Sequence, residues 1–186
     1  MTVDELLARE AIRDCIARVA RGEDRRDAAM LRGCFHADAT LDFGIFAADL
    51  DGYLDWVVPG SPRVLLTLHT LGQSLIRVEG ARAVAETHIA SYHRIDGDTG
   101  AIDMTIGGRY LDRLAVRDGA WRITHRQMVY DWLGPTTASA DWANGLMGAP
   151  FLHDRATGRT LDDASVGLFS PAAGSGSAGL FSPAGG

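Results

Sequence analysis

The stretch between residues 63 and 133 is a succession of strand-like runs, rich in β-branched and aromatic residues and broken only by short glycine-containing turns. The turns lie at Glu79-Gly80, at residues 96–100 and at Asp118-Gly119, and such sequences are typical of hairpins. Hairpins join antiparallel neighbours, so this half of the chain predicts long antiparallel strands. Gly107-Gly108 falls inside one expected strand, 102–116, and predicts a bulge or sharp bend there.

The first sixty residues have helical periodicity instead. Thr2 and Glu5 have the spacing of a capping box. The apolar residues that follow recur at helical intervals and predict a first helix that ends near Arg21, with Gly22 just beyond it. We expect a second helix over 28–34, a turn over 35–38, a short strand over 39–43 and a third helix over 50–58. Helices followed by antiparallel strands indicate an α+β fold, with the helices packed on one face of a curved sheet.

Composition narrows the functional classes. The chain has 186 residues, enough for one ordinary domain, and its net charge of −6 gives no basic surface for nucleic acid. No apolar run approaches the ~20 residues that span a bilayer, so we expect no membrane partner. Cys15 and Cys34 are too few for a disulfide framework, and the N-terminus has no apolar signal segment, so we expect a cytoplasmic protein. No glycine-rich phosphate loop is present, and we expect no cofactor.

The composition changes after residue 133, where Gly, Ala, Ser, Thr and Pro dominate. The segment Gly-Leu-Phe-Ser-Pro at 167–171 recurs at 179–183, and two copies are too few for a solenoid. We therefore expect a catalytic domain over 1–133, a C-terminal extension over 134–166 and a flexible tail over 167–186.

His69 is the first candidate for chemistry, because it stands alone in the apolar run 63–73. Its ordinary pKa lies near neutrality, so it can act as a base, although a core histidine bonded to a backbone carbonyl is the alternative interpretation. His69, His88 and His93 together could supply three metal ligands, but their spacing matches no zinc signature, and we expect no metal.

Several short motifs resemble one family. Three motifs occur in the order seen in the SnoaL-like branch of the nuclear-transport-factor-two-like (NTF2-like) superfamily: Gly22-Glu23-Asp24-Arg25, Phe35-His36-Ala37-Asp38-Ala39 and Thr67-Leu68-His69. The segments 106–110 and 119–123 and the residue Arg126 also fit. Within this branch the chain resembles the γ-hexachlorocyclohexane dehydrochlorinases and, more distantly, the scytalone and bile-acid 7α-dehydratases. The resemblance implies a cone-shaped α+β barrel, of the NTF2-like or cystatin-like kind, with three N-terminal helices in the concave face of a strongly curved, mainly antiparallel sheet.

The resemblance also implies site residues. In dehydrochlorinase-like members an aspartate after the first helix binds a sheet histidine, which here are Asp24 and His69, and an arginine near the leaving group matches Arg126. The carboxylate would orient the imidazole, and the pocket and the carboxylate would together leave His69 mostly neutral near pH 7. Family dehydratases often carry a tyrosine in the first helix region, where this chain has Val19 and Ala20, so Tyr92, Tyr110 and Tyr130 are the candidates to replace it.

The remaining predicted site residues bind substrate. Strand alternation leaves two faces for the strand 83–94, and we favour the face of His88 and Tyr92 as the one that lines the pocket. Arg126 has the opposite parity to Ile123, so a bulge is needed to bring both inward. The full predicted lining set is Phe43, Trp56, Leu71, His88, Tyr92, Met104, Met128 and Tyr130.

The sequence therefore predicts a cofactor-independent lyase, a dehydratase, dehydrohalogenase or formaldehyde-releasing aldol-type lyase, acting on a small apolar or aromatic molecule. One alternative is a ketosteroid-isomerase-like isomerase, for which Glu86 or Asp103 would be the sheet carboxylate, or a polyketide cyclase. A non-catalytic binding module is the other, because this fold carries many functions. We expect a homo-oligomer, a dimer or trimer, formed through apolar residues on the outer face of the sheet.

Overall fold

The computed structural model describes residues 1–135, 137–138 and 149–150. Its helices are α1 (Val3–Arg25), α2 (Ala28–Cys34) and α3 (Leu50–Val57), and the strands before the long hairpins are β1 (Phe35–Asp42) and β2 (Ala47–Asp49). The long strands are β3 (Val64–Glu79), β4 (Arg82–Gly97), β5 (Gly100–Arg117) and β6 (Ala120–Leu133), followed by the short β7 (Thr137–Ala138). The α+β class, with helices first and long strands after them, is confirmed.

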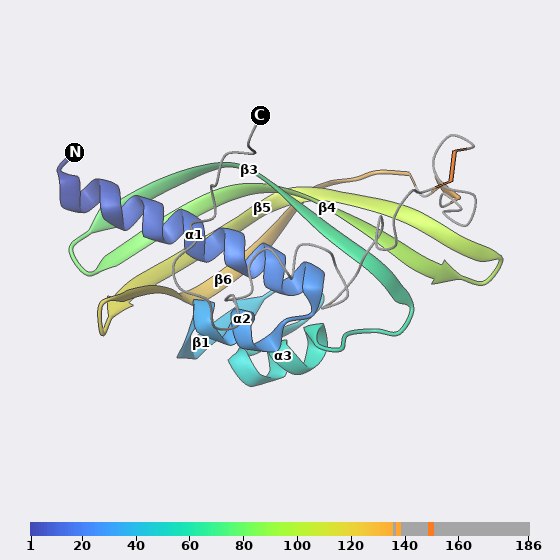
Figure 1. The fold of residues 1–186 in the computed structure, drawn as a ribbon, viewed down its shortest axis with the longest axis horizontal. Coiled ribbons are helices and arrows are strands. Elements are labelled where there is room, and N and C mark those ends of the chain that lie inside the picture. Colours follow the sequence, from blue (N-terminus) through green and yellow to red (C-terminus); the bar gives the residue numbers. More distant parts are fainter. Residues whose placement is uncertain (136, 139–148, 151–186) are drawn as a thin grey trace, which may run out of the picture.

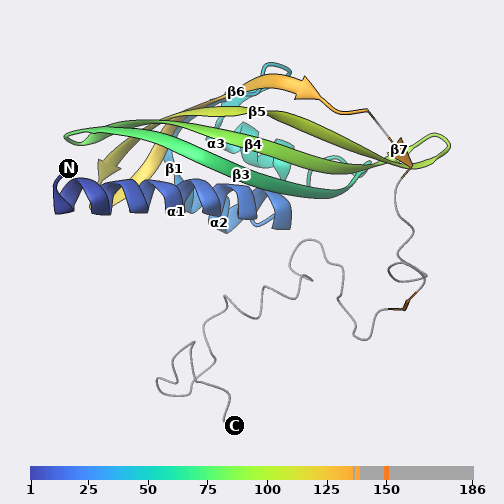
Figure 2. The same ribbon diagram turned by 90° about the horizontal axis from the view of Figure 1, so that it is seen from above.

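One mixed sheet carries all the described strands. Its order is β2-β1-β6-β5-β4-β3, with β7 paired to β5. Only the β1–β6 pair among these is parallel. The sheet curves around the three helices, and α1 runs along its concave side (Figures 1 and 2). The sheet is open rather than closed into a barrel, because its path ends at β2 and β3. Within the described part of the chain, no helix is long and apolar enough to cross a membrane.

Helix α1 begins as predicted, with the Glu5 amide donating to Thr2 Oγ1 over 3.1 Å. It buries Ile12, Cys15, Ile16 and Val19 against the sheet. The predicted end near Arg21 is wrong, because the helix continues to Arg25 and its C-cap is Arg26, at φ 55°. Gly22 lies inside the helix for a packing reason: a Cβ there would lie 2.8 Å from the Leu31 side chain of α2.

The start of β1 also differs from the prediction. Strand β1 begins at Phe35, directly after α2, where the sequence predicted a turn over 35–38. Phe35 pairs with Ile123 of β6, and both side chains are buried. A parallel partner almost ninety residues away therefore decides this segment, and no local sequence signal carries that information.

The hairpins and both bulges follow the predictions more closely. Gly80 and Asp118-Gly119 have positive φ at their turns. The β5–β6 register shifts between Gly107 and Gly108, where the sequence predicted a bulge. It shifts again between Arg113 and Leu114, which leaves Thr124 of β6 as an extra residue. This second bulge lies between Ile123 and Arg126, where the sequence predicted one, and it allows both side chains to be buried.

The predicted boundary at residue 133 coincides with the end of β6. The C-terminal extension and the repeated tail segment lie almost entirely outside the described residues. Thr137 and Ala138 are described, and they pair with Asp103 and Ile102 at the edge of β5.

Candidate active site

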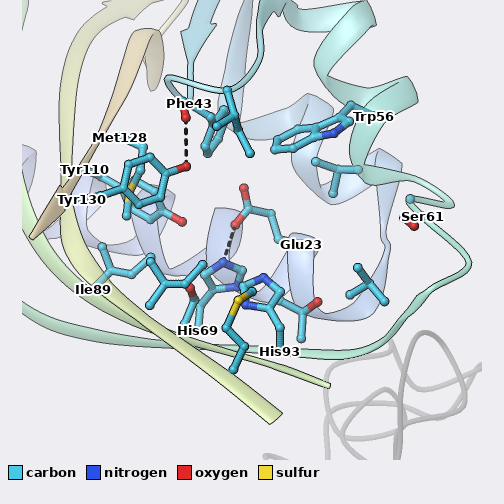
Figure 3. Close-up of a pocket in the computed structure, with 18 of the residues that line it drawn as sticks. Glu23, Phe43, Trp56, Ser61, His69, Ile89, His93, Tyr110, Met128 and Tyr130 are labelled. Atoms are coloured by element: carbon cyan, nitrogen blue, oxygen red, sulfur yellow. Dashed lines mark hydrogen bonds and ion pairs between the residues drawn. The ribbon is translucent and has the colours of Figure 1, made fainter. Parts of the chain in front are cut away.

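A cavity of about 260 Å³ lies between the concave sheet, the last turn of α1 and α3. Its wall is largely apolar and includes five of the predicted lining residues, Phe43, Trp56, Met104, Met128 and Tyr130. Tyr130 closes one side by donating to the Phe43 carbonyl over 2.9 Å (Figure 3). The polar part of the wall consists of Glu23, Arg26, Ser61, Thr67, His69, Ser91 and His93.

Three predicted lining residues lie elsewhere. Leu71 is half-buried and packs against the core, outside the cavity wall. The favoured face of β4 is the wrong one: Ile89, Ser91 and His93 point into the cavity, and His88 and Tyr92 lie on the outer face. The register explains this, since the buried residues of β4 are the odd-numbered ones from Ala83 to Ser91. On the outer face Tyr92 donates to Asp103 over 2.7 Å.

The structure brings Asp24 and His69 together. Asp24 lies in the last turn of α1 and His69 in β3. Asp24 Oδ1 is 2.6 Å from His69 Nδ1, and the His69 backbone N–H donates to both carboxylate oxygens over 3.1 Å. The His69 side chain is only 9% exposed and that of Asp24 only 7%. The backbone and ring contacts together orient the imidazole, and an ionised Asp24 keeps the proton of the neutral ring on Nδ1.

A second carboxylate, which the sequence reasoning missed, lies at the other end of the same ring. Glu23 Oε2 is 3.2 Å from His69 Nε2, and Glu23 Oε1 accepts a hydrogen bond from the Tyr53 hydroxyl. Glu23 projects between His69 and the aromatic side chains of Phe43 and Trp56 (Figure 3). The sequence does contain a signal for Glu23, because Glu23 and Asp24 are consecutive acids, and consecutive side chains on a helix point about 100° apart. The prediction that the helix ends near Arg21 left both acids outside it, so this signal was not used.

The two carboxylates decide the charge of the ring. Burial acts to lower the pKa of His69, but Glu23 and the hydrogen bond to Asp24 outweigh it, so the pKa stands above its ordinary value. The sequence predicted a mostly neutral ring near pH 7 because it counted one carboxylate. The second carboxylate, Glu23, is the largest cause that raises this pKa.

His93 is a second imidazole in the wall, and its environment is the reverse. Its ring lies edge-on to that of His69, with centroids 6.3 Å apart. Burial and the neighbouring His69 and Arg26 lower the pKa of His93 to about 4. Its Nδ1 is buried without a hydrogen-bond partner among the described residues. His93 is therefore a neutral, polar point in the cavity wall at physiological pH.

Arg126 does not line the cavity, which contradicts its predicted place beside a leaving group. Its side chain is fully buried, and Nε and Nη2 donate to the two oxygens of Asp112 over 2.7 and 2.8 Å. The guanidinium stacks on the Tyr110 ring at 4.0 Å. Tyr110 itself lines the cavity, so Arg126 lies in the layer behind the wall.

The positions of other candidates separate the competing chemistries. His88 and His93 lie on opposite faces of β4, so the three-histidine metal set is not assembled, and no group of ligands suited to a metal occurs in the described ranges. Glu86 contacts Arg109, and Asp103 accepts from Tyr92, on the outer face of the sheet. Neither Glu86 nor Asp103 lines the cavity, and the carboxylate in the cavity wall is that of Glu23 in α1.

The fold and this site agree with the family comparison. The model of the SnoaL-like domain matches residues 4–127. The chain belongs to the SnoaL-like family. That match covers α1 to β6, and so every residue of the polar wall.

Solved structures share the fold. A type 2 hexachlorocyclohexane dehydrochlorinase, LinA, is 20% identical, with a TM-score of 0.68, and the match covers 78% of this chain and 99% of that one. LinA-type3 from Novosphingobium barchaimii is 21% identical, with a TM-score of 0.65 and coverages of 81% and 98%. A candidate scytalone dehydratase from Novosphingobium aromaticivorans is 19% identical, with a TM-score of 0.66 and coverages of 82% and 99%. No curated protein sequence matches the chain.

Proposed function

We propose that this SnoaL-like protein is a cofactor-independent lyase that removes a proton and a leaving group from a small, largely apolar or aromatic molecule. The observation that carries the proposal is the buried Asp24–His69 pair in the wall of an apolar cavity. A desolvated imidazole oriented by a carboxylate is a general base, and the apolar wall keeps water from competing.

The reaction breaks a substrate C–H or O–H bond at His69. In an elimination the C–H electron pair forms the new C=C π bond, and the leaving group departs with its own bonding pair as halide or, after protonation, as water. In a formaldehyde release the O–H electron pair forms the C=O bond of formaldehyde, and the C–C bonding pair stays on the remaining carbon, which takes up the proton that His69 received. Asp24 stabilises the imidazolium that forms. The names of two structural neighbours, a dehydrochlorinase and a candidate scytalone dehydratase, denote eliminations of this kind and support the proposal.

A second candidate is supported by Glu23. A carboxylate inside an apolar cavity is also what an isomerase needs to move a proton along a carbon skeleton, so the ketosteroid-isomerase-like alternative now rests on Glu23 rather than on Glu86 or Asp103. The products separate the two functions, because isomerisation retains every atom of the substrate and elimination releases a leaving group.

The experiment measures turnover of a panel of halogenated and hydroxylated ring compounds by release of halide or by the new double bond. We expect His69→Ala to lose about a hundredfold or more in turnover, the usual range for a general base. That variant leaves the Asp24 and Glu23 carboxylates buried without the imidazole that both contact, so its melting point should fall as well.

Two further variants isolate chemistry from folding in that experiment. Asp24→Asn keeps the shape and should lose activity with little change in melting. Glu86→Gln, a carboxylate change on the outer face, is the matched control and should keep wild-type turnover. Full turnover after His69→Ala, or a loss of turnover in Glu86→Gln with none in His69→Ala, would contradict the proposal.

A further inference from the structure

Both nitrogens of the His69 ring are occupied by carboxylates. Nδ1 lies 2.6 Å from Asp24, and Nε2 lies 3.2 Å from Glu23 Oε2. A general base must bring a lone pair within hydrogen-bond reach of the substrate proton. The Nε2 lone pair is directed at Glu23, so a substrate in the cavity meets the Glu23 carboxylate at the place where a free imidazole nitrogen was expected.

Glu23 is built into the wall with Oε1 held by a hydrogen bond and Oε2 facing His69 Nε2 at 3.2 Å. Oε1 accepts from Tyr53, whose ring is fully buried and stacked on Phe43 with centroids 5.8 Å apart. Oε2 is buried and has no hydrogen-bond partner in the described structure. The side chain is 6% exposed and still lines the cavity. A buried carboxylate oxygen that faces a ring nitrogen without a hydrogen bond is costly unless a proton or a ligand meets it.

The Nε2–Oε2 contact requires a proton. With Nδ1–H donating to Asp24, an unprotonated Nε2 presents its lone pair to the lone pairs of an ionised Glu23, which is repulsive. One proton shared by these two atoms removes the repulsion. Loss of that proton leaves two electron-rich atoms facing each other, and this makes the pair a stronger base than either group alone.

We infer that Glu23 is a second catalytic residue, which takes the substrate proton at Oε2 and shares it with His69 Nε2. The inference deepens the proposed function and rests on it. In the step, the substrate C–H bond breaks and an O–H bond forms on Glu23. The C–H electron pair becomes the new π bond, and the leaving group departs with its bonding pair, so no oxidant or reductant is needed. Asp24 holds the Nδ1 proton throughout.

A nitro-substituted benzisoxazole tests this assignment, because it is a small flat aromatic whose isoxazole ring opens when a base removes the C–H proton of that ring. The N–O bond breaks in the same step, and the coloured cyanophenolate product is followed by absorbance. The reaction needs only a desolvated base beside an apolar wall, which this cavity provides. Turnover is measured across pH for the wild type, Glu23→Gln, Tyr53→Phe and His69→Gln, with Glu86→Gln as the matched control.

We expect the pH-independent rate of Glu23→Gln to fall by about a hundredfold or more. Its acid limb should also move to lower pH, because the main cause that raises the His69 pKa is gone. Tyr53→Phe, which loses only the hydrogen bond to Oε1, should lose about tenfold in rate with KM little changed, and it stands in if Glu23→Gln does not fold.

Three outcomes divide the possibilities. A Glu23→Gln variant with the wild-type plateau and only a shifted acid limb would make Glu23 an electrostatic neighbour and overturn the inference, while the proposed function stands. Wild-type rates in Tyr53→Phe would count against the inference in the same way. A wild-type protein no faster than buffer at any pH would overturn the proposed function, and the inference with it.

Discussion

His69 occupies a position where burial alone would lower the pKa of its ring, and the pKa nevertheless stands above its ordinary value. Adjacent residues of one helical turn, Glu23 and Asp24, contact the two ring nitrogens and outweigh the cost of desolvation. The motif around Asp24 could identify the first contact from the sequence. The second depended on where α1 ends, and a glycine near the expected boundary gave the wrong signal.

Arg126 and Asp112 form a fully buried ion pair, and its removal tests whether Arg126 is structural. Arg126→Met leaves Asp112 as an uncompensated charge in the core, so we expect a loss of about 3–5 kcal/mol in the free energy of unfolding. The double variant Arg126→Met/Asp112→Leu should recover most of it, as measured by urea unfolding. A double variant as unstable as the single one would contradict this account.

His93 should make the protein sensitive to acid. The pKa of His93 in the folded protein is about 4, below the ordinary value of 6.5. Between these two pH values the ring binds a proton in the unfolded chain but not in the folded protein. Stability is therefore lost as pH falls from 6.5 towards 4, by up to roughly 3 kcal/mol. Denaturant unfolding at both ends of this range should show a smaller loss for His93→Gln. Equal losses in variant and wild type would refute this.

Sequence patterns predicted the elements better than their ends. Apolar periodicity located three helices and the long hairpins, because both signals are local. The first residues of β1 and the burial parity of β4 were not predictable in this way. Phe35 is a strand residue because it pairs with Ile123, and His93 faces inward because of its register with β5. Such pairings involve residues far apart in the sequence.

The double glycine of β5 is a packing requirement of the sheet. A Cβ on Gly108 would lie 2.1 Å from the Val129 carbonyl oxygen, a backbone atom that cannot move aside. Gly108→Ala should therefore destabilise the protein by roughly 1–3 kcal/mol or more. Gly33→Ala is the matched control: it lies in α2 with nothing within 4 Å of its Cβ, and should be neutral or gain about 0.5–1 kcal/mol. Similar melting points for the two variants would contradict this.

At the scale of the molecule, the helices cover the concave side of the sheet and leave apolar residues on its outer side. Met104 and Ile106 both line the cavity. The apolar residues that remain exposed include Leu68, Leu75 and Trp132. Exposed apolar side chains on one sheet face are typical of an interface between subunits.

We therefore still predict a dimer or trimer that forms through the outer face. Light scattering at micromolar concentration should give a multiple of the 19.9 kDa chain mass. Leu68→Lys combined with Leu75→Lys should lower the mass to that of one chain, because charged residues are costly in the core of an interface. Lysine changes on the N-terminal turns of α1, at Leu7 for example, are the control. A monomeric wild type would refute the prediction.

The two acids at the end of α1 also tie the chemistry to the local order of one helical turn. Helix ends open more readily than helix centres, and each opening of this turn would withdraw Glu23 and Asp24 from His69 at once. The proton affinity of His69 and the amide hydrogen exchange at residues 22–25 should therefore both depend on how often this helical turn opens. A molecule that occupies the cavity against Glu23 should slow exchange there more than at the N-terminal end of the same helix.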